Sequence, residues 1–321
     1  MRLAIVIPWY NEEQVLPETV KRLTGVLNEL IAQDEIAADS FMLLVNDGSR
    51  DRTWPMIQRY HEENHLVKGV NLAGNVGHQN ALMAGLMTAK DYADALISID
   101  SDLQDDISVI AEMVARYKEG YDIVYGVRNA RDTDTFFKKN TALAFYKLMA
   151  WLGVKSVYNH ADYRLMSRRA VCQLANYHER NLFLRGIVPL IGYETTSVYY
   201  RRSERFAGES KYPLSKMLNF AIDGITSFSV RPLRLIASLG FLFLLCSLVA
   251  IVYTLYVYFR GETVAGWASL MLSVWFLGSL ILIAIGIVGE YIGKIYLETK
   301  NRPRFLIESV LTEEDNQDEK G

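Results

Sequence analysis

The sequence predicts an α/β domain followed by a C-terminal hairpin of two transmembrane helices. Over the first half of the chain, short apolar runs alternate with helical patterns. This alternation is typical of βαβ units and of a mainly parallel, Rossmann-like sheet. Nearer the C-terminus, two long stretches carry no charged residue, at 235–259 and 263–289. Uncharged stretches of that length are typical of helices that cross a bilayer.

Five apolar runs predict strands, and helices are predicted after the first three of them. The runs are Leu3–Pro8, Phe41–Val45, Val67–Leu72, Ala95–Ile99 and Asp122–Gly126. The helices are expected behind the start signal at 11–13, from about Thr53, and behind the loop 74–77.

Polar residues follow the first four predicted strands. In a parallel sheet, ligands bind beyond the carboxyl ends of the strands, so these side chains are expected to converge on one crevice. They are Tyr10, Asn11, Asp47, Asn75, Asp100 and Asp102. Each one alone could be an ordinary turn former, and their joint occurrence favours a functional site.

The hairpin prediction also sets the topology. As a helix, each uncharged stretch would be roughly 35–40 Å long, whereas the hydrocarbon core is ~30 Å thick. Basic residues flank the outer ends of the hairpin, and the connecting turn offers only Arg260, offset by Glu262. By the positive-inside rule, both ends of the hairpin are cytosolic. The alternative is a pair of core helices in a soluble protein, for which shorter apolar runs are expected.

The predicted division of the chain has four parts. They are an α/β domain at 1–212, an interfacial amphipathic helix at 213–233, two spans (about 235–259 and 264–289) within 234–293, and a cytosolic tail at 294–321. The end of the tail is acidic and polar and is expected to be disordered.

Composition and missing motifs exclude several classes of protein. The net charge of −3 argues against a general nucleic-acid binder. The only cysteines, Cys172 and Cys246, lie in different predicted parts, so no disulfide framework is expected. No G-x-G-x-x-G follows the first strand and no P-loop occurs, which argues against a dinucleotide enzyme and a P-loop NTPase. Histidines at metal-ligand spacing and a G-x-S-x-G elbow are also missing.

Asp100, Asp102 and Gln104 occupy alternate positions after the fourth predicted strand. Two carboxylates and an amide oxygen are hard ligands that suit Mg²⁺ or Mn²⁺. A cation there would clamp a nucleotide diphosphate and stabilise the charge that develops on it as a leaving group. The alternative is an acidic turn in which Asp105 or Asp106 caps the following helix.

Two segments combine basic and aromatic side chains, 128–139 and 199–212. Amphipathic stretches follow them, at Phe136–Leu152 and Leu214–Val230. Near a bilayer, this combination suits an anionic lipid headgroup. The alternative interpretation, which is open for any single arginine, is a solvated edge strand and general headgroup anchoring.

Seven motifs and the two spans together resemble family 2 glycosyltransferases of the GT-A fold. The motifs are IPWYNEE, VNDGSRDRT, NVGHQNALMAG, SIDSDLQDD, YGVRN, ADYRLMSRRA and RFAGESKYPLSKM. The resemblance covers the chain up to about Arg304 and is specifically to the polyprenyl-phosphate group. That group includes bactoprenyl-phosphate glucosyltransferases and is related to dolichol-phosphate mannose synthases.

The resemblance implies three adjoining binding sites. The nucleotide-sugar site would comprise Pro8, Tyr10, Asn11, Glu12, Asp47, Asn75, Asp100 and Ser101. The acceptor phosphate would be bound by Arg128, Lys138, Lys139, Arg205, Ser210 and Lys211. The metal motif matches Asp100, Asp102 and Gln104. The catalytic candidates are Asp162 and Arg164, which match residues near the reacting sugar, together with Asp102.

Two positions depart from the family pattern. Asn46 stands where relatives usually carry an aspartate, and His78 stands where they often carry a lysine or arginine. These departures leave the contacts to the donor phosphates and the sugar preference open.

The reaction implied by the resemblance is transfer of a hexose, by default glucose from UDP-glucose, to undecaprenyl or another polyprenyl phosphate. We expect inversion at the anomeric carbon, Mg²⁺ or Mn²⁺ as cofactor, and a multi-pass protein of the inner (plasma) membrane whose catalytic domain is cytosolic. The product would be a lipid-linked sugar for cell-surface glycan modification. Because the acceptor phosphate is already anionic near neutral pH, Asp162 is expected to orient Arg164 or the sugar more than to act as a base.

Several alternatives stay open. The donor could instead be GDP-mannose, UDP-galactose, a nucleotide N-acetylhexosamine or a modified arabinose. The chain could also be a membrane-anchored binding protein that has lost its chemistry. A processive polysaccharide synthase would need more spans and a Q-x-x-R-W signature, which the chain lacks. Copies of the chain could associate through the lipid-facing surface of the spans.

Overall fold

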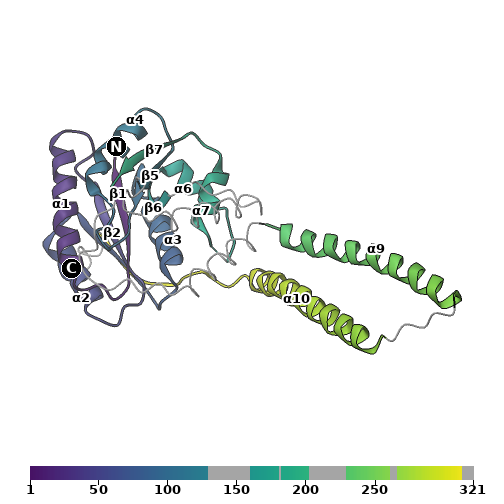
Figure 1. Cartoon of the computed structure of the whole chain (residues 1–321). Helices are drawn as coiled ribbons and strands as arrows, with labels where there is room; N and C mark the ends of the chain where they lie inside the picture. The colour runs from purple at the N-terminus through teal and green to yellow at the C-terminus, as the bar shows by residue number, and fades with distance from the viewer. Residues whose placement is uncertain (129–159, 181, 202–228, 261–265, 313–321) are drawn as a thin grey trace. The chain divides into compact units, whose positions relative to one another are not determined.

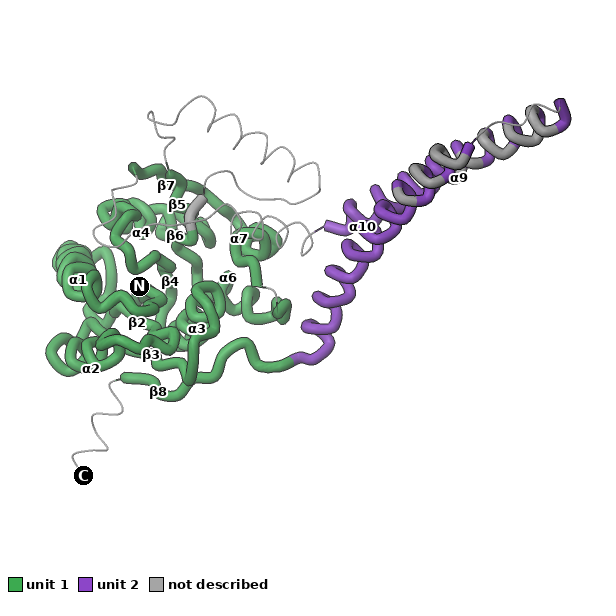
Figure 2. The backbone as a smooth tube through the Cα atoms, turned by 60° about the horizontal axis from the view of Figure 1, so that its bottom comes forward, with its two compact units in different colours: residues 1–140, 156–211, 302–321 green, residues 141–155, 212–301 purple. Residues whose placement is uncertain are grey.

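The structure is a computed structural model that describes residues 1–128, 160–180, 182–201, 229–260 and 266–312 (Figure 1). The chain divides into two compact units, which Figure 2 colours separately. The first unit comprises residues 1–140, 156–211 and 302–321, and the second comprises 141–155 and 212–301.

The first unit is built on a mixed sheet of eight strands in the order β7-β5-β6-β4-β1-β2-β3-β8. The strands are β1 (Leu3–Trp9), β2 (Phe41–Asn46), β3 (Val67–Leu72), β4 (Ala95–Ser98), β5 (Ile123–Arg128), β6 (His160–Ser167), β7 (Thr195–Tyr200) and β8 (Ile307–Leu311). Strands β1 to β4 run parallel to one another, and β5 runs parallel to β7. Strands β6 and β8 run antiparallel to their neighbours. The predicted mainly parallel α/β sheet is therefore confirmed.

The helices connect and cover these strands. In the first unit they are α1 (Leu16–Ala32), α2 (Thr53–Glu63), α3 (His78–Ala89), the 3₁₀ turn η1 (Ile107–Val109), α4 (Ile110–Lys118), α6 (Arg168–Leu174), α7 (Leu184–Ile187) and the 3₁₀ turn η2 (Val188–Ile191). The predicted cap at the start of η1 is Asp106, whose side chain accepts a hydrogen bond from Ser108 N. The five predicted strands correspond to β1–β5, with small differences at their ends.

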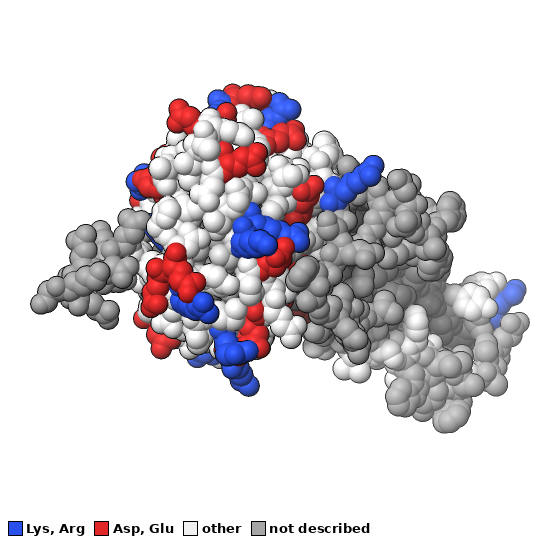
Figure 3. Space-filling model, turned by 90° about the vertical axis from the view of Figure 1, so that its left-hand side faces the viewer, with Lys and Arg blue, Asp and Glu red and all other residues white. Residues whose placement is uncertain are grey.

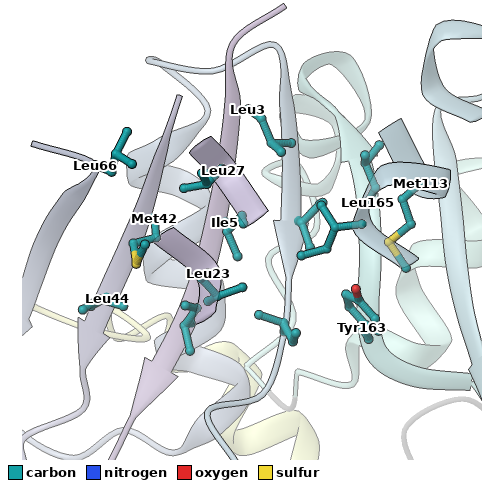
Figure 4. Packing of buried hydrophobic residues seen from close by; sticks show 14 of the residues in the cluster. Leu3, Ile5, Leu23, Leu27, Met42, Leu44, Leu66, Met113, Tyr163 and Leu165 are labelled. Atoms are coloured by element: carbon teal, nitrogen blue, oxygen red, sulfur yellow. The ribbon is translucent and has the colours of Figure 1, made fainter. Parts of the chain in front are cut away.

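Every residue of β1 and β2 is buried, as expected where helices cover both faces of a sheet. On one face, Ile5 of β1 and Leu44 of β2 share a hydrophobic cluster with Leu23 and Leu27 of α1 (Figure 4). Because side chains alternate along a strand, the neighbouring residues of β1 and β2 point to the opposite face.

Helix α3 packs unusually closely against that opposite face. A Cβ atom on Gly85 would lie 2.4 Å from Val6 Cγ1 and 2.6 Å from Val45 Cγ2. Glycine is therefore needed at this position, since any larger residue would push α3 away from β1 and β2. The close contact fixes the helix whose first residue, His78, follows the third strand.

The C-terminal strand β8 was not predicted, and it completes the edge of the sheet. It pairs with β3 so that Leu72 lies opposite Ile307, and Ala73 N donates to Leu306 O at 2.9 Å. The chain therefore enters β8 at the edge of the sheet where the parallel strands end. The first three residues of β8 are exposed, so the segment has no run of buried apolar residues that would predict a strand.

A short chain of amide hydrogen bonds connects β8 with β2. Asn46 Nδ2 donates to Asn71 Oδ1 at 2.7 Å, and Asn71 Nδ2 donates to Glu308 Oε2 at 2.7 Å. The chain ends on an acceptor, which fixes the direction of both amides. This arrangement explains why residue 46 is an asparagine, since an aspartate could not donate to Asn71.

The second unit contains two long helices, α9 (Arg231–Phe259) and α10 (Trp267–Thr299). Within the described residues, one segment, Phe276–Thr299, is long and apolar enough to cross a membrane. Apolar side chains such as Phe241, Ile281 and Leu282 are exposed along these helices. Exposed apolar surface of this extent is typical of contact with lipid or with another protein.

On the face of the first unit that is visible in Figure 3, acidic and basic side chains are interspersed with uncharged ones. Neither sign forms a continuous patch in this view.

The amide chain generates a stability prediction. In Asn46→Asp, the new carboxylate would face the acceptor Asn71 Oδ1. If the Asn71 amide rotates to donate to that carboxylate, its Oδ1 instead faces the acceptor Glu308 Oε2. We expect a loss of about 1–3 kcal/mol in the free energy of unfolding, because a buried polar group loses its partner. Glu308→Gln alone should change stability little, and the double variant Asn46→Asp/Glu308→Gln should recover most of the loss by reversing the direction of the chain. Denaturation of the full chain in detergent measures all four proteins, and additive effects in the double variant would contradict this account.

Candidate active site

The polar residues that follow β1 to β4 converge as predicted, because these strands are parallel and end at the same edge of the sheet. The loops contact one another in sequence around this edge. The segment after β1 contacts the segment after β2, which contacts the loop after β3, and the first residue of α3 contacts the turn after β4.

Hydrogen bonds hold residues 11–13 against residues 49–53. Asn11 has a φ of 53°, its N donates to Ser49 Oγ at 3.0 Å, and its Oδ1 accepts from Arg50 N at 2.8 Å. The left-handed backbone at Asn11 suits asparagine, which tolerates this region better than most residues. Tyr10 precedes this hydrogen-bonded segment and is exposed, whereas Pro8 is buried within β1. Glu12 N donates to Thr53 Oγ1 at 3.2 Å.

Asp47 holds the loop between β3 and α3. Its Oδ1 accepts from Val76 N at 2.7 Å, and its Oδ2 accepts from Gly77 N at 3.0 Å and from Asn75 Nδ2 at 3.1 Å. Burial raises the pKa of this carboxyl above its ordinary value, and the two backbone amides partly oppose that effect. Gly48 follows with a φ of 61°, and a Cβ there would lie 2.5 Å from Asn75 N. The Asn-Asp-Gly motif therefore shapes the loop that leads into α3, and contact of Asp47 with a nucleotide base stays a prediction.

Asp100, Ser101 and Asp102 form the turn after β4. Asp100 Oδ1 is buried and lies 3.2 Å from its basic partner, His78 Nε2. Asp102 Oδ1 accepts from Gln104 N at 3.1 Å, and the intervening Leu103 has a φ of 54°. A left-handed leucine is uncommon, and such backbone strain is typical of turns at functional sites.

The residues of this turn fit a divalent cation that is completed by a ligand. Within the described part of the chain, no group of three or more His, Cys, Asp or Glu side chains could hold a metal ion alone. Asp100 and Asp102 supply two carboxylates, and the largely buried Gln104 supplies an amide oxygen. The donor set is what favours a cation, because two carboxylates and an amide oxygen at alternate positions of one turn are hard oxygen ligands.

His78 stands beside this turn, with its Nε2 3.2 Å from Asp100 Oδ1. Burial lowers the pKa of His78, but the hydrogen bond and charge of Asp100 and the charge of Asp162 outweigh it, so the net shift is upward. This shift favours the protonated form of His78 beside Asp100.

Asp162 and Arg164 of β6 form a buried ion pair at the same edge. Arg164 Nη2 donates to Asp162 Oδ1 at 2.7 Å, and the two residues are 1% and 6% exposed. A second arginine, Arg185 of α7, donates from Nε to Asp162 Oδ1 at 3.3 Å and from Nη2 to Oδ2 at 3.1 Å. Burial alone would raise the pKa of Asp162, but the charges of Arg185 and Arg164 hold it well below its usual range. A carboxylate in this state is a weak base, which favours the predicted orienting role.

Arg128 binds the buried carboxylate of Asp105, for which the sequence predicted only a helix-capping role. Its Nη2 donates to Asp105 Oδ1 at 2.9 Å, and Tyr200 OH donates to the same oxygen at 2.6 Å. Burial lowers the pKa of Arg128, but the charge of Asp105 outweighs it and raises the pKa overall. Tyr200 also packs edge-on against Tyr163, with ring centroids 5.5 Å apart. Binding of the acceptor phosphate by Arg128 stays a prediction.

The remaining predicted site residues lie outside the described part of the chain. They are Lys138, Lys139, Arg205, Ser210 and Lys211. Conversely, the structure adds Arg185, Asp105 and Tyr200 to the site. No pattern in the sequence marks Arg185, since it stands on a four-residue helix whose place against Asp162 follows from the fold. Asp105 could have been found from the sequence, because it lies in the acidic segment 102–106 that follows the fourth strand.

Two known families match parts of this chain. A family described as glycosyl transferase family 2 matches residues 4–174, and a domain described as the GtrB C-terminal hairpin matches residues 231–295. The first match spans β1 to α6 and so includes Asp47, Asp100, Asp162 and Arg164. The second spans α9 and most of α10. Together with the apolar segment Phe276–Thr299, it indicates that the chain associates with a membrane.

Relatives extend over nearly the whole chain. An uncharacterized glycosyltransferase, YkoT of Bacillus subtilis, is 56% identical over 306 residues, which is 95% of this chain and 91% of that protein. The bactoprenol glucosyl transferase of Shigella phage SfX is 39% identical over 318 residues, covering 96% and 99% of the two chains. Among solved structures, glucosyl-3-phosphoglycerate synthase of Mycobacterium tuberculosis in complex with phosphoglyceric acid aligns with a TM-score of 0.44 at 17% identity, over 71% of this chain and 78% of that one.

The buried ion pairs of the site generate a prediction about Asp162. Asp162→Asn leaves the fully buried Arg164 guanidinium without its counter-charge, so we expect the free energy of unfolding to fall by about 3–5 kcal/mol. The matched control is Asp122→Asn at the opposite edge of the sheet. Asp122 is also buried and binds Arg169, but the Arg169 side chain is 66% exposed and would remain solvated. Denaturation of both variants should show a clearly larger loss for Asp162→Asn. Equal losses would mean that Asp162 is not needed to stabilise Arg164.

Proposed function

The chain belongs to glycosyl transferase family 2, and from this premise we propose that it transfers glucose from UDP-glucose to undecaprenyl or another polyprenyl phosphate. The observation that carries the proposal is the carboxylate turn 100–102 at the sheet edge, in a chain that also matches the GtrB C-terminal hairpin. The full-length similarity to a bactoprenol glucosyl transferase supports both the sugar and the lipid.

The donor is proposed to lie across the carboxyl ends of β1, β2 and β4. Pro8, Tyr10, Asn11 and Glu12 would line the nucleoside side of the site. The loop 75–77, which Asp47 holds, would lie beside the diphosphate together with Asp100 and Ser101. Supporting this placement, the backbone of these loops is fixed by side-chain hydrogen bonds before any ligand arrives, so little conformational entropy is lost on binding.

The proposed metal site consists of Asp100, Asp102 and Gln104. Bound Mg²⁺ or Mn²⁺ would supply Lewis-acid stabilisation of the diphosphate leaving group. The protein itself contributes the fixed positions of the carboxylates and His78, whose Nε2 lies 3.2 Å from Asp100 Oδ1. Preorganised charges of this kind stabilise a leaving group without reorganisation during the reaction.

We propose a single displacement that inverts the anomeric carbon. The acceptor phosphate oxygen forms the new bond to the sugar, the bond to the diphosphate breaks, and UDP leaves with the electron pair. No proton has to be removed from an anionic phosphate, so the reaction does not need Asp162 as a base. Asp162 orients Arg164, and the acceptor phosphate is held by Arg128 with Lys138, Lys139, Arg205, Ser210 and Lys211.

The membrane topology is part of the proposal. Both helices of the hairpin cross the inner (plasma) membrane, and the domain 1–212 and the tail 294–321 are cytosolic. The flanking charges support this orientation, since Arg231 and Arg234 lie in the first turn of α9, and Lys294 and Lys300 lie near the end of α10. The lipid-linked sugar would then serve cell-surface glycan modification.

The direct test is an assay of the purified full chain in detergent with undecaprenyl phosphate, Mn²⁺ or Mg²⁺, and a panel of labelled nucleotide sugars. We expect label from UDP-glucose in the extracted lipid and no label without the metal. Label only from GDP-mannose or another donor would contradict the proposed sugar. Absence of labelled lipid from every donor would contradict the proposed reaction and favour a binding protein.

The metal site generates a prediction of its own. Asp102→Asn should lower kcat by about 100-fold or more, because charge stabilisation of the leaving group is lost, while the unfolding temperature changes little. Asp106→Asn is the matched control, since asparagine also caps a helix and the Asp106 carboxylate accepts from Ser108 N. Turnover of Asp102→Asn within a few-fold of the native protein would remove Asp102 from the metal site.

A further inference from the structure

Arg185 is a charged residue of the site to which neither the motifs nor the proposed function gives a role. It stands on α7 and binds both oxygens of Asp162, at 3.3 and 3.1 Å. Its side chain remains 33% exposed, although its partner carboxylate is almost completely buried. Among the described residues, its Nη1 makes no hydrogen bond. Arg185 therefore uses one edge of its guanidinium within the protein and keeps another edge available.

One carboxylate faces two arginines in the ion-pair cluster of Asp162, Arg164 and Arg185. Arg164 is fully buried and needs this carboxylate as its counter-charge, because an unpaired buried guanidinium is strongly destabilising. The positive charge of Arg185 is therefore in excess within this cluster.

Arg185 also lies near the groups proposed to hold the substrates. Burial lowers the pKa of Arg185, but the charges of Asp162 and Asp100 outweigh it, so the net shift is upward. The charge of Arg128 has the opposite effect. The charge of Arg185 in turn opposes protonation of His78. All four of these groups are thus within electrostatic range of the Arg185 guanidinium.

The backbone that carries Arg185 is fixed from two directions. Leu184 N donates to Gln79 Oε1 at 2.9 Å, and Leu184 O accepts from Arg164 Nη1 at 3.4 Å. Gln79 is the second residue of α3, directly after His78. The start of α3, β6 and α7 are therefore joined at this point, and the available edge of Arg185 is held in a defined place.

We propose that Arg185 is a substrate-binding residue whose open guanidinium edge binds a phosphate oxygen at the site. This inference rests on the proposed function and names a further residue for it. A guanidinium forms charge-assisted, geometrically specific hydrogen bonds with phosphate, and an arginine already oriented by a carboxylate loses little entropy in doing so. The phosphate belongs to either the donor diphosphate or the acceptor lipid, and both have the same oxygen chemistry.

The test measures binding of two probes, UDP and a short-chain polyprenyl phosphate, to the full chain in detergent by calorimetry. Arg185→Gln should weaken binding of at least one probe by about tenfold or more. Arg185→Lys should restore part of that loss, because it keeps the charge but not the forked geometry. The matched control is Arg169→Gln, which removes an arginine from the buried Asp122 at the opposite edge of the sheet and should leave both affinities unchanged.

Each outcome has a defined meaning. Weaker binding of UDP alone assigns Arg185 to the donor diphosphate, and weaker binding of the lipid phosphate alone assigns it to the acceptor. Affinities of Arg185→Gln within twofold of the native protein for both probes would overturn the proposal, even if the unfolding temperature falls. Because binding does not require turnover, this result is independent of the labelled-lipid assay, which alone decides the proposed function.

Discussion

The parallel pairing of β1, β2, β3 and β4 is the constraint on which the candidate active site depends. Parallel strands end at one edge of a sheet, so the polar segments that follow them must lie side by side. Side-chain hydrogen bonds then hold these segments together, with Asp47 binding the loop after β3 and His78 lying against Asp100. The close packing of α3 at Gly85 places His78 at this edge. Hydrophobic packing of the sheet thus positions groups that are widely separated in the sequence.

Buried charge is the second property of this edge. Asp162, Arg164, Asp105 and Arg128 are paired at short distances, and each would be costly to bury alone. The pair of Asp162 and Arg164 lies within β6, and the pair of Asp105 and Arg128 joins the turn before η1 to β5. Asp162 is held ionised by two arginines, which suits the proposed reaction, because its phosphate nucleophile already carries negative charge. Under that proposal, stability and chemistry depend on the same ion pairs.

The sequence predicted the parts of the fold in which local pattern and tertiary environment agree. Strands β1 to β5 are apolar runs, and Asp100 and Asp102 follow a strand, so both were identified. Strand β6 was not identified because it carries Asp162 and Arg164, whose burial depends on partners that are distant in the sequence. Strand β8 is half-exposed and pairs with β3 across more than two hundred residues, as the bond between Asn71 and Glu308 shows. Arg185 was missed for the same reason, since nothing near it in the sequence indicates the carboxylate that it binds.

The chain belongs to glycosyl transferase family 2 and also matches the GtrB C-terminal hairpin. The candidate active site therefore belongs to a membrane-associated chain. The central claim is that Asp100 and Asp102 hold a divalent cation together with the donor diphosphate. Diffraction data from crystals of the full chain grown with Mn²⁺ and UDP, recorded where manganese scatters anomalously, test it most directly. The account predicts an anomalous peak within coordination distance, about 2.0–2.3 Å, of both carboxylates. A peak bound to UDP but away from these two side chains, or bound UDP without any peak, would contradict it.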